Sequence, residues 1–144
     1  MKPFAFLRKT SPSAKQNNYG QFNGYIAFDS QEIFNLGLAW VEYDIDGCFE
    51  QYVMIRDIYK AAPSEITYMG EHKFHEIGSI YPISEIPQEA IDKTLFVIGF
   101  DTCHIDNSWD KDTYDSVKSE TIEWLAKVID IYEFYVKAMK EEEL

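Results

Sequence analysis

Residues 95–100, LFVIGF, form an uninterrupted run of five apolar residues and one glycine. Successive side chains of a strand point to opposite faces of a sheet, so a strand with this sequence is apolar on both faces. We expect it to be the most deeply buried strand of the protein. The run stops at Asp101, and two aspartates, one histidine and one asparagine occur within residues 101–107. This strand end is therefore the first place to look for a functional site.

A long amphipathic helix is expected over residues 113–142, from about Tyr114 to about Glu142, with Asp112 as its N-cap. Its apolar stripe recurs at helical spacing and consists of Val117, Thr121, Trp124, Leu125, Val128, Tyr132, Tyr135, Val136 and Met139. Three further apolar side chains widen this face, namely Ile122, Ile131 and Phe134. The broad face either packs entirely on a sheet or meets a second subunit in part, which leaves a homo-oligomer open.

Shorter apolar patterns predict further strands, at residues 4–8, 22–29, 38–45 and 48–55. Asp46-Gly47 is a typical two-residue hairpin turn between the last two, although a helix through Tyr59 competes with the strand at 48–55. A second hairpin around Gly70 is expected from residues 66–69 and 73–81. Residues 10–21 are rich in Ser, Asn and Gln and predict a loop, and Ser30 is the expected N-cap of one or two helical turns.

Together these elements predict a single α+β domain over residues 1–144, in which an antiparallel sheet of about five to six strands packs against the C-terminal helix. The 144 residues are 46% apolar and 16% aromatic, which is enough to bury a core. A disordered chain is poor in such residues, so we expect the domain to fold on its own.

The charge of the chain limits its partners. With 25 acidic and 13 basic residues, the formal net charge is −12. Direct binding of nucleic acid or docking on an anionic membrane is not expected, because both need clustered Lys and Arg. An acidic chain is compatible with plain solubility or with mimicry of a polyanion. The two cysteines, Cys48 and Cys103, form no CxxC pair. No apolar run is long enough for a membrane span or a signal peptide. We therefore expect a cytoplasmic location.

Asp101, His104 and Asp106 are the candidate site residues at the end of the buried strand. Two carboxylates and an imidazole so close in sequence can bind a divalent metal, perform acid–base chemistry, or hydrogen-bond a polar ligand. The ordinary alternative is that Asp101 is a turn residue, since Asp is common in turns. Trp109 either stacks on a ligand or closes the core beneath the loop. The chain carries no P-loop, no GxGxxG and no GxSxG motif.

His72 and His75 are the remaining histidines, and their odd spacing places them on opposite faces of a strand. His75 is the better candidate to join His104, because Gly78 beyond it permits close approach of the backbone. The candidate metal ligands are accordingly His75, Asp101, His104 and Asp106. The candidate catalytic residues are His75, Asp101 and His104. The cofactor, if any, is otherwise unknown.

These residues resemble a family of small, largely uncharacterised phage-encoded proteins with an Asn-Gly-Tyr, a His-Gly and a Gly-Phe-Asp-x-x-His motif. The resemblance covers roughly residues 22–130, and its motifs fall on Asn23, Gly24, Tyr25, His75, Gly99, Phe100, Asp101 and His104. It implies a phage accessory protein in the cytoplasm of an infected bacterium, and such proteins often antagonise antiviral defence.

Three functions follow as hypotheses, and the leading one is not enzymatic. In it the protein blocks or sequesters a defence protein or a nucleotide-like signal through an Asp/His pocket, where Tyr25 or Trp109 stacks on the ligand and basic residues gather around it. The candidate basic residues are Arg8, Lys9, Arg56 and Lys73. One alternative is a metal- or His-dependent phosphodiester hydrolase. The other is an acidic mimic of nucleic acid that inhibits a nucleic-acid-binding protein through Glu32, Glu42, Asp44, Asp46 and the C-terminal acidic tail.

Overall fold

The computed structural model describes residues 1–17, 19–39, 41–43, 50–102 and 108–142. Its main feature is a five-stranded sheet in the order β5-β7-β2-β1-β6, in which all recorded strand pairs are antiparallel. The strands of this sheet are β1 (Phe4–Lys9), β2 (Phe22–Asp29), β5 (Ile66–Lys73), β6 (Tyr81–Pro82) and β7 (Thr94–Phe100). A separate pair is formed by β3 (Val41–Tyr43) and β4 (Glu50–Tyr52).

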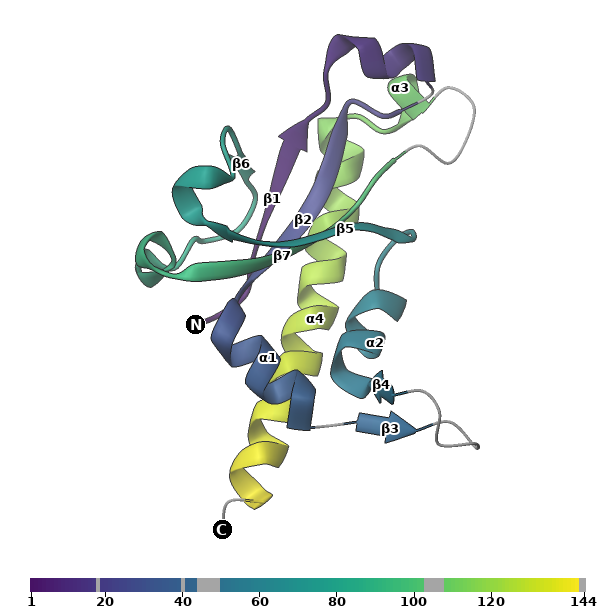
Figure 1. Cartoon of the computed structure of the whole chain (residues 1–144). Coiled ribbons are helices and arrows are strands. Elements are labelled where there is room, and N and C mark those ends of the chain that lie inside the picture. The colour runs from purple at the N-terminus through teal and green to yellow at the C-terminus, as the bar shows by residue number, and fades with distance from the viewer. Residues whose placement is uncertain (18, 40, 44–49, 103–107, 143–144) are drawn as a thin grey trace.

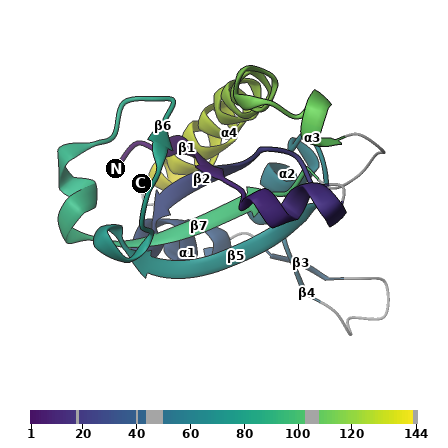
Figure 2. The same cartoon turned by 90° about the horizontal axis from the view of Figure 1, so that it is seen from above.

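Helices cover one face of the sheet, which we call the inner face (Figures 1 and 2). They are α1 (Ser30–Ala39), α2 (Val53–Lys60) and the 29-residue α4 (Tyr114–Glu142), with the short α3 (Ser108–Lys111) preceding α4. The described part of the chain also contains three 3-10 helices: η1 (Pro12–Asn17), η2 (Phe74–Glu76) and η3 (Gln88–Asp92). The predicted α+β class, with an antiparallel sheet against a long C-terminal helix, is confirmed.

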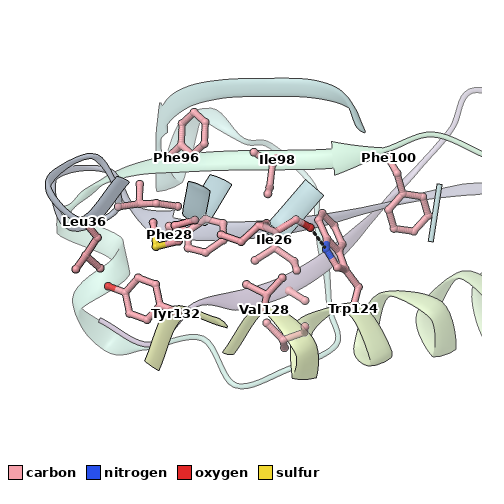
Figure 3. Packing of buried hydrophobic residues seen from close by; sticks show 14 of the residues in the cluster. Ile26, Phe28, Leu36, Phe96, Ile98, Phe100, Trp124, Val128 and Tyr132 are labelled. Atoms are coloured by element: carbon pink, nitrogen blue, oxygen red, sulfur yellow. Dashed lines mark hydrogen bonds between the residues drawn. The ribbon is translucent and has the colours of Figure 1, made fainter. Parts of the chain in front are cut away.

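The inner core lies between the sheet and α4 (Figure 3). Trp124 of α4 is only 1% exposed and packs edge-on against Phe100, with ring centroids 5.7 Å apart. Its indole Nε1–H donates to the carbonyl of Ile58 at 3.1 Å, and this hydrogen bond connects α2 to α4. The predicted stripe of α4 is therefore mainly core, whereas Phe134, outside that stripe, is 66% exposed.

A second apolar cluster covers the opposite, outer face of the sheet. Phe4, Phe6, Leu95 and Val97 from the strands contact Ile77, on the segment that carries η2 and η3. Leu95 and Val97 therefore point outward, while Phe96, Ile98 and Phe100 of the same strand belong to the inner core. This double cover explains why LFVIGF is apolar on both faces.

Four local predictions need correction. The predicted hairpin around Gly70 is wrong, because β5 continues straight through Gly70 and pairs with β7 from Ile66 to Lys73. The predicted strand at 38–45 is shorter, since α1 ends at Ala39 and β3 covers only Val41–Tyr43. The strand at 48–55 is likewise reduced to β4, and the competing helix forms as α2. The 10–21 loop contains η1. Asp46-Gly47 lies outside the described residues.

A fifth correction concerns α1, whose N-cap is Asp29 and not Ser30. The Asp29 Oδ1 atom accepts the backbone N–H of Gln31 at 3.0 Å and that of Glu32 at 3.3 Å. A carboxylate satisfies these free amides better than the neighbouring hydroxyl does, so the cap falls on the last residue of β2. Within the described residues, no helix combines the length and the apolarity needed to cross a membrane.

Candidate functional site

The structure describes only part of the predicted corner after β7. His104 and Asp106 lie outside the described residues, as does Cys103. Asp101 is half-buried, and its backbone carbonyl accepts a hydrogen bond from Ser64 Oγ at 3.2 Å. The proposed grouping of Asp101 with His104 therefore stays a prediction.

The described part of this corner holds neighbouring segments together. Thr102 is fully buried, and its Oγ1 accepts the N–H of Gly20 at 3.0 Å and donates to the carbonyl of Phe22 at 3.1 Å. The side-chain amide of Gln21 donates to the carbonyl of Trp109 at 2.7 Å. Trp109 is half-buried, and the recorded contact uses its backbone. These bonds join the start of β2 to the segment before α4, which is an architectural role.

The prediction that Asp112 caps α4 is wrong. The first turn is closed by Thr113, whose N–H donates to Ser116 Oγ at 2.9 Å and whose carbonyl accepts the N–H of Val117 at 3.0 Å. Asp112 is buried one position earlier, and its Oδ2 has no hydrogen-bond partner among the described residues.

Tyr25, the remaining predicted ligand contact, lies on the outer face of the sheet. Its ring stacks on Phe6, with centroids 5.3 Å apart and planes 11° from parallel. On its other side it meets the edge of Tyr68, at 5.9 Å and 80°. Tyr25 therefore stands between strand β1 and edge strand β5, above β7.

Around Tyr25 the structure forms a small hollow of about 80 Å³, which we call the outer-face cavity. Its polar lining is Arg8, Tyr25, Tyr68, His72 and Glu76, and its apolar lining is Phe6, Ile77 and Val97. The lining comes from β1, β2, β5, β7 and the segment carrying η2, so it forms only when the sheet is assembled.

Two glycines make room for the rings of this cavity. Gly99 on β7 is paired with Tyr25 on one side and Tyr68 on the other. A Cβ atom at Gly99 would lie 2.4 Å from Tyr25 Cδ1, so only glycine lets this ring lie across the strand. At Gly70 a Cβ atom would lie 3.2 Å from both His72 Nε2 and the Tyr68 hydroxyl. Gly70, the residue expected to turn, instead lies beside the Tyr68 and His72 side chains.

Tyr68 and His72 form a pair within the cavity. The Tyr68 hydroxyl and His72 Nε2 are hydrogen-bonded, and the two rings lie 5.9 Å apart and within 10° of parallel. Both side chains point outward, because residues two and four apart in a strand share a face. The pair can present a phenol and an imidazole to the same ligand.

The electrostatics of the cavity are set by Arg8 and burial. Burial raises the pKa of the Tyr25 hydroxyl, and the nearby charge of Asp101 and Tyr68 adds to this, while the hydrogen bond with Asn23 and the charge of Arg8 oppose it. Tyr25 is thus held as a neutral hydrogen-bonding group at physiological pH. Arg8 has no ion pair within the described residues, and its side chain lines the cavity together with the Glu76 carboxylate. Glu76 is engaged at Oε1 by the N–H of Lys73, at 2.7 Å.

His75 does not line the cavity. It lies exposed on η2, beyond the end of β5, while His72 takes the position facing Tyr25 and Tyr68. The sequence pattern that identifies His72 is the even spacing of Tyr68, Gly70 and His72 in one continuous strand. That pattern was hidden by the expectation of a hairpin at Gly70.

The metal hypothesis gains no further residue from the structure. Within the described ranges, no group of three or more His, Cys, Asp or Glu side chains lies close enough to hold a metal ion. His75 and Asp101 are the two predicted ligands inside those ranges, and His104 and Asp106 lie outside them. The metal site stays a prediction.

Comparison of the chain with models of protein families, with curated proteins and with solved structures found no match.

Proposed function

We propose that this protein is a binding protein that captures a small, anionic, nucleotide-like ligand at the outer-face cavity and withholds it from a host antiviral defence. The observation that carries the proposal is an unpaired Arg8 lining the same cavity as Tyr25, Tyr68 and His72. The setting, a phage accessory protein acting in an infected bacterium, is supported by the motif resemblance at Tyr25, Gly99 and Asp101.

Arg8 answers the main objection to an anionic ligand, which is the net charge of −12. A guanidinium presents a planar fork of donors that matches a phosphate or a carboxylate, and such charge-assisted hydrogen bonds are about twice as strong as neutral ones. Arg8 forms no ion pair in the described part of the chain, so its guanidinium donors are available to a ligand, with the Glu76 carboxylate lining the same cavity.

The size of the cavity indicates how the ligand is held. A volume of about 80 Å³ is well below the roughly 300–1,000 Å³ of pockets that enclose whole small molecules. The cavity therefore admits one group, such as a phosphate beside Arg8, while the rest of the ligand lies on the surface. Tyr68 is 38% exposed and offers a ring face on which a nucleobase can stack.

The described residues supply the contacts on which the binding proposal rests, and turnover stays an untested alternative. The hydrolase alternative requires His104 and Asp106, which lie outside the described residues. Glu32, one contact residue of the acidic-mimic alternative, is half-buried and accepts a hydrogen bond from the Tyr132 hydroxyl at 3.1 Å.

The test is calorimetric titration with AMP, 3′,5′-cyclic GMP and cyclic di-AMP, against wild type, Arg8→Gln and Lys9→Gln. Lys9 is the matched control, because it neighbours Arg8 on β1, points to the other face of the sheet and carries the same charge. Loss of a charged hydrogen-bond donor costs about 1.5–3 kcal/mol. We therefore expect Arg8→Gln to weaken binding by roughly tenfold or more, with Lys9→Gln close to wild type.

Two results would overturn this proposal. One is that no nucleotide in the panel binds, and the other is that Arg8→Gln and Lys9→Gln weaken binding equally, which would mean that only overall charge matters. Release of phosphate or opening of the cyclic nucleotide during the titration would instead favour the hydrolase.

A further inference from the structure

A second, larger groove lies where the first residues of the chain run beside the C-terminal half of α4. Its volume is about 460 Å³, which is within the roughly 300–1,000 Å³ typical of small-molecule sites. It shares no lining residue with the outer-face cavity. We call it the terminal groove.

The floor of the terminal groove is apolar. Ile129, Tyr132 and Val136 of α4 line it, and their spacing of three and seven residues places them on one face of the helix. Tyr132 is buried, and Ile129 and Val136 remain half-exposed. The floor is thus a strip of hydrocarbon that the sheet does not cover completely.

The rim of the groove is basic in an otherwise acidic protein. Lys2, Lys137 and Lys140 line it, all three are exposed, and none has an ion pair among the described residues. Lys137 and Lys140 are three residues apart, so their ammonium groups lie along the same side of α4.

Two carboxylates also line the groove, and one of them is compensated. Glu32 Oε2 pairs with the Met1 ammonium at 2.7 Å, and Glu32 Oε1 accepts the Tyr132 hydroxyl. Glu133 is the other carboxylate. The rim thus has three ammonium groups and one carboxylate without an ion pair among the described residues. Its local charge is positive, whereas the net charge of the protein is negative.

We propose that the terminal groove binds an amphiphilic anion of the fatty-carboxylate class. The hydrocarbon tail lies along Ile129 and Val136, and the carboxylate is held by Lys137 and Lys140, with Lys2 facing them across the groove. An apolar floor alone would bind any apolar molecule, and the lysines without an ion pair would alone bind any anion. Their combination selects a ligand that has both parts.

The test is calorimetric titration of the full chain with dodecanoate below its micelle concentration, with acetate as the anion that lacks a tail. We expect one saturable dodecanoate site per chain and no acetate binding. Lys137→Gln combined with Lys140→Gln should weaken dodecanoate by roughly tenfold or more, because two charge-assisted contacts are lost. Val136→Trp should abolish binding by filling the groove.

The matched control is Lys118→Gln combined with Lys127→Gln, which removes the same charge from α4 outside the groove and should bind dodecanoate like wild type. Equal loss in both double variants, or the absence of a saturable site in wild type, would overturn the proposal. Binding to phosphatidylglycerol vesicles without binding of monomeric dodecanoate would also overturn it, in favour of a basic patch that faces a membrane. Circular dichroism melts of every variant check that the fold is retained.

Discussion

The Lys93 ammonium lies 2.8 Å from Asp29 Oδ2, and this ion pair connects the end of η3 to the start of α1. The other carboxylate oxygen of Asp29 caps α1 by accepting the amides of Gln31 and Glu32. Asp29 is only 6% exposed. The Asp29 side chain therefore connects the segment that carries η3, on the outer face of the sheet, to helix α1 on the inner face.

Replacing Asp29 by Ala should lower the free energy of unfolding by about 0.5–2 kcal/mol from the lost cap alone. Asp29→Asn retains an oxygen that can cap the helix but loses the charge that pairs with Lys93, so a smaller loss is expected. Urea unfolding followed by circular dichroism measures both. Asp92→Ala, an exposed neighbour of Lys93, is the control and should change stability little. Equal stability of Asp29→Ala and Asp92→Ala would show that the cap contributes nothing.

Asp29 also gives the protein an acid-sensitive component of stability. Burial alone would raise the pKa of its carboxyl, but the hydrogen bond and charge of Lys93 and the two backbone amides outweigh it, and the pKa lies below its ordinary value of 3.8. The unfolded chain then binds the proton more readily than the folded one, so this contribution is complete above the unfolded pKa and is lost as the pH falls through the folded one.

The difference in unfolding free energy between wild type and Asp29→Asn should therefore be largest near neutral pH and should shrink as the pH falls below about 4. Urea titrations of both proteins at pH 7, 5, 4 and 3 measure it. A difference that stays constant across this range would mean that the carboxylate of Asp29 is not preferentially stabilised in the folded protein.

The elements predictable from the sequence are those whose apolar period is long and consistent. Residues 22–29 form β2 with the predicted bounds, and α4 spans Tyr114–Glu142 as its stripe from Val117 to Met139 indicates. In both, burial and local preference favour the same structure. Shorter elements depend on packing that local sequence does not report, since α2 packs against α4 and β4 lies against β3 and α2.

Gly70 shows why part of the candidate site was missed. A glycine between two short apolar runs is typical of a turn, yet the same lack of a side chain is needed where rings crowd over a strand. Gly70 serves the second purpose, so Tyr68 and His72 face the cavity from one strand. Arg8 was identified only as one of several basic residues, because its neighbours across the sheet are distant in sequence.

Trp124 links two helices, so its replacement tests the inner core. Trp124→Phe retains a ring beside Phe100 but removes the indole donor, which leaves the buried carbonyl of Ile58 without that bond. An unsatisfied buried group costs about 1–3 kcal/mol, and we expect a loss of at least this size, with about 3–5 kcal/mol for Trp124→Ala. Trp109→Phe is the control, since the recorded hydrogen bond of Trp109 uses its backbone. Urea unfolding that ranks Trp109→Phe as the more damaging change would contradict this view of the core.

Gly99 and Tyr25 are predicted to be strongly coupled. In wild type, Gly99→Ala places a methyl carbon 2.4 Å from Tyr25 Cδ1, so the ring must leave its position on Phe6. Overpacking of this kind typically costs about 1–3 kcal/mol. In a Tyr25→Ala background the obstructing ring is absent, and the same substitution should cost less, with the Gly24 carbonyl oxygen, 3.0 Å from the new Cβ atom, as the remaining close contact.

A double-mutant cycle of wild type, Gly99→Ala, Tyr25→Ala and the double variant, measured by urea unfolding, gives the coupling directly. We expect a coupling of at least about 1 kcal/mol, with the double variant more stable than the sum of the single losses predicts. The same cycle in the nucleotide titration separates packing from binding. Gly99→Ala should lower both the affinity for the ligand and the free energy of unfolding, because Tyr25 is displaced from the cavity that Arg8 lines. Additive losses of stability would show that the Tyr25 ring is free to move aside, and that glycine at position 99 is not what holds the cavity open.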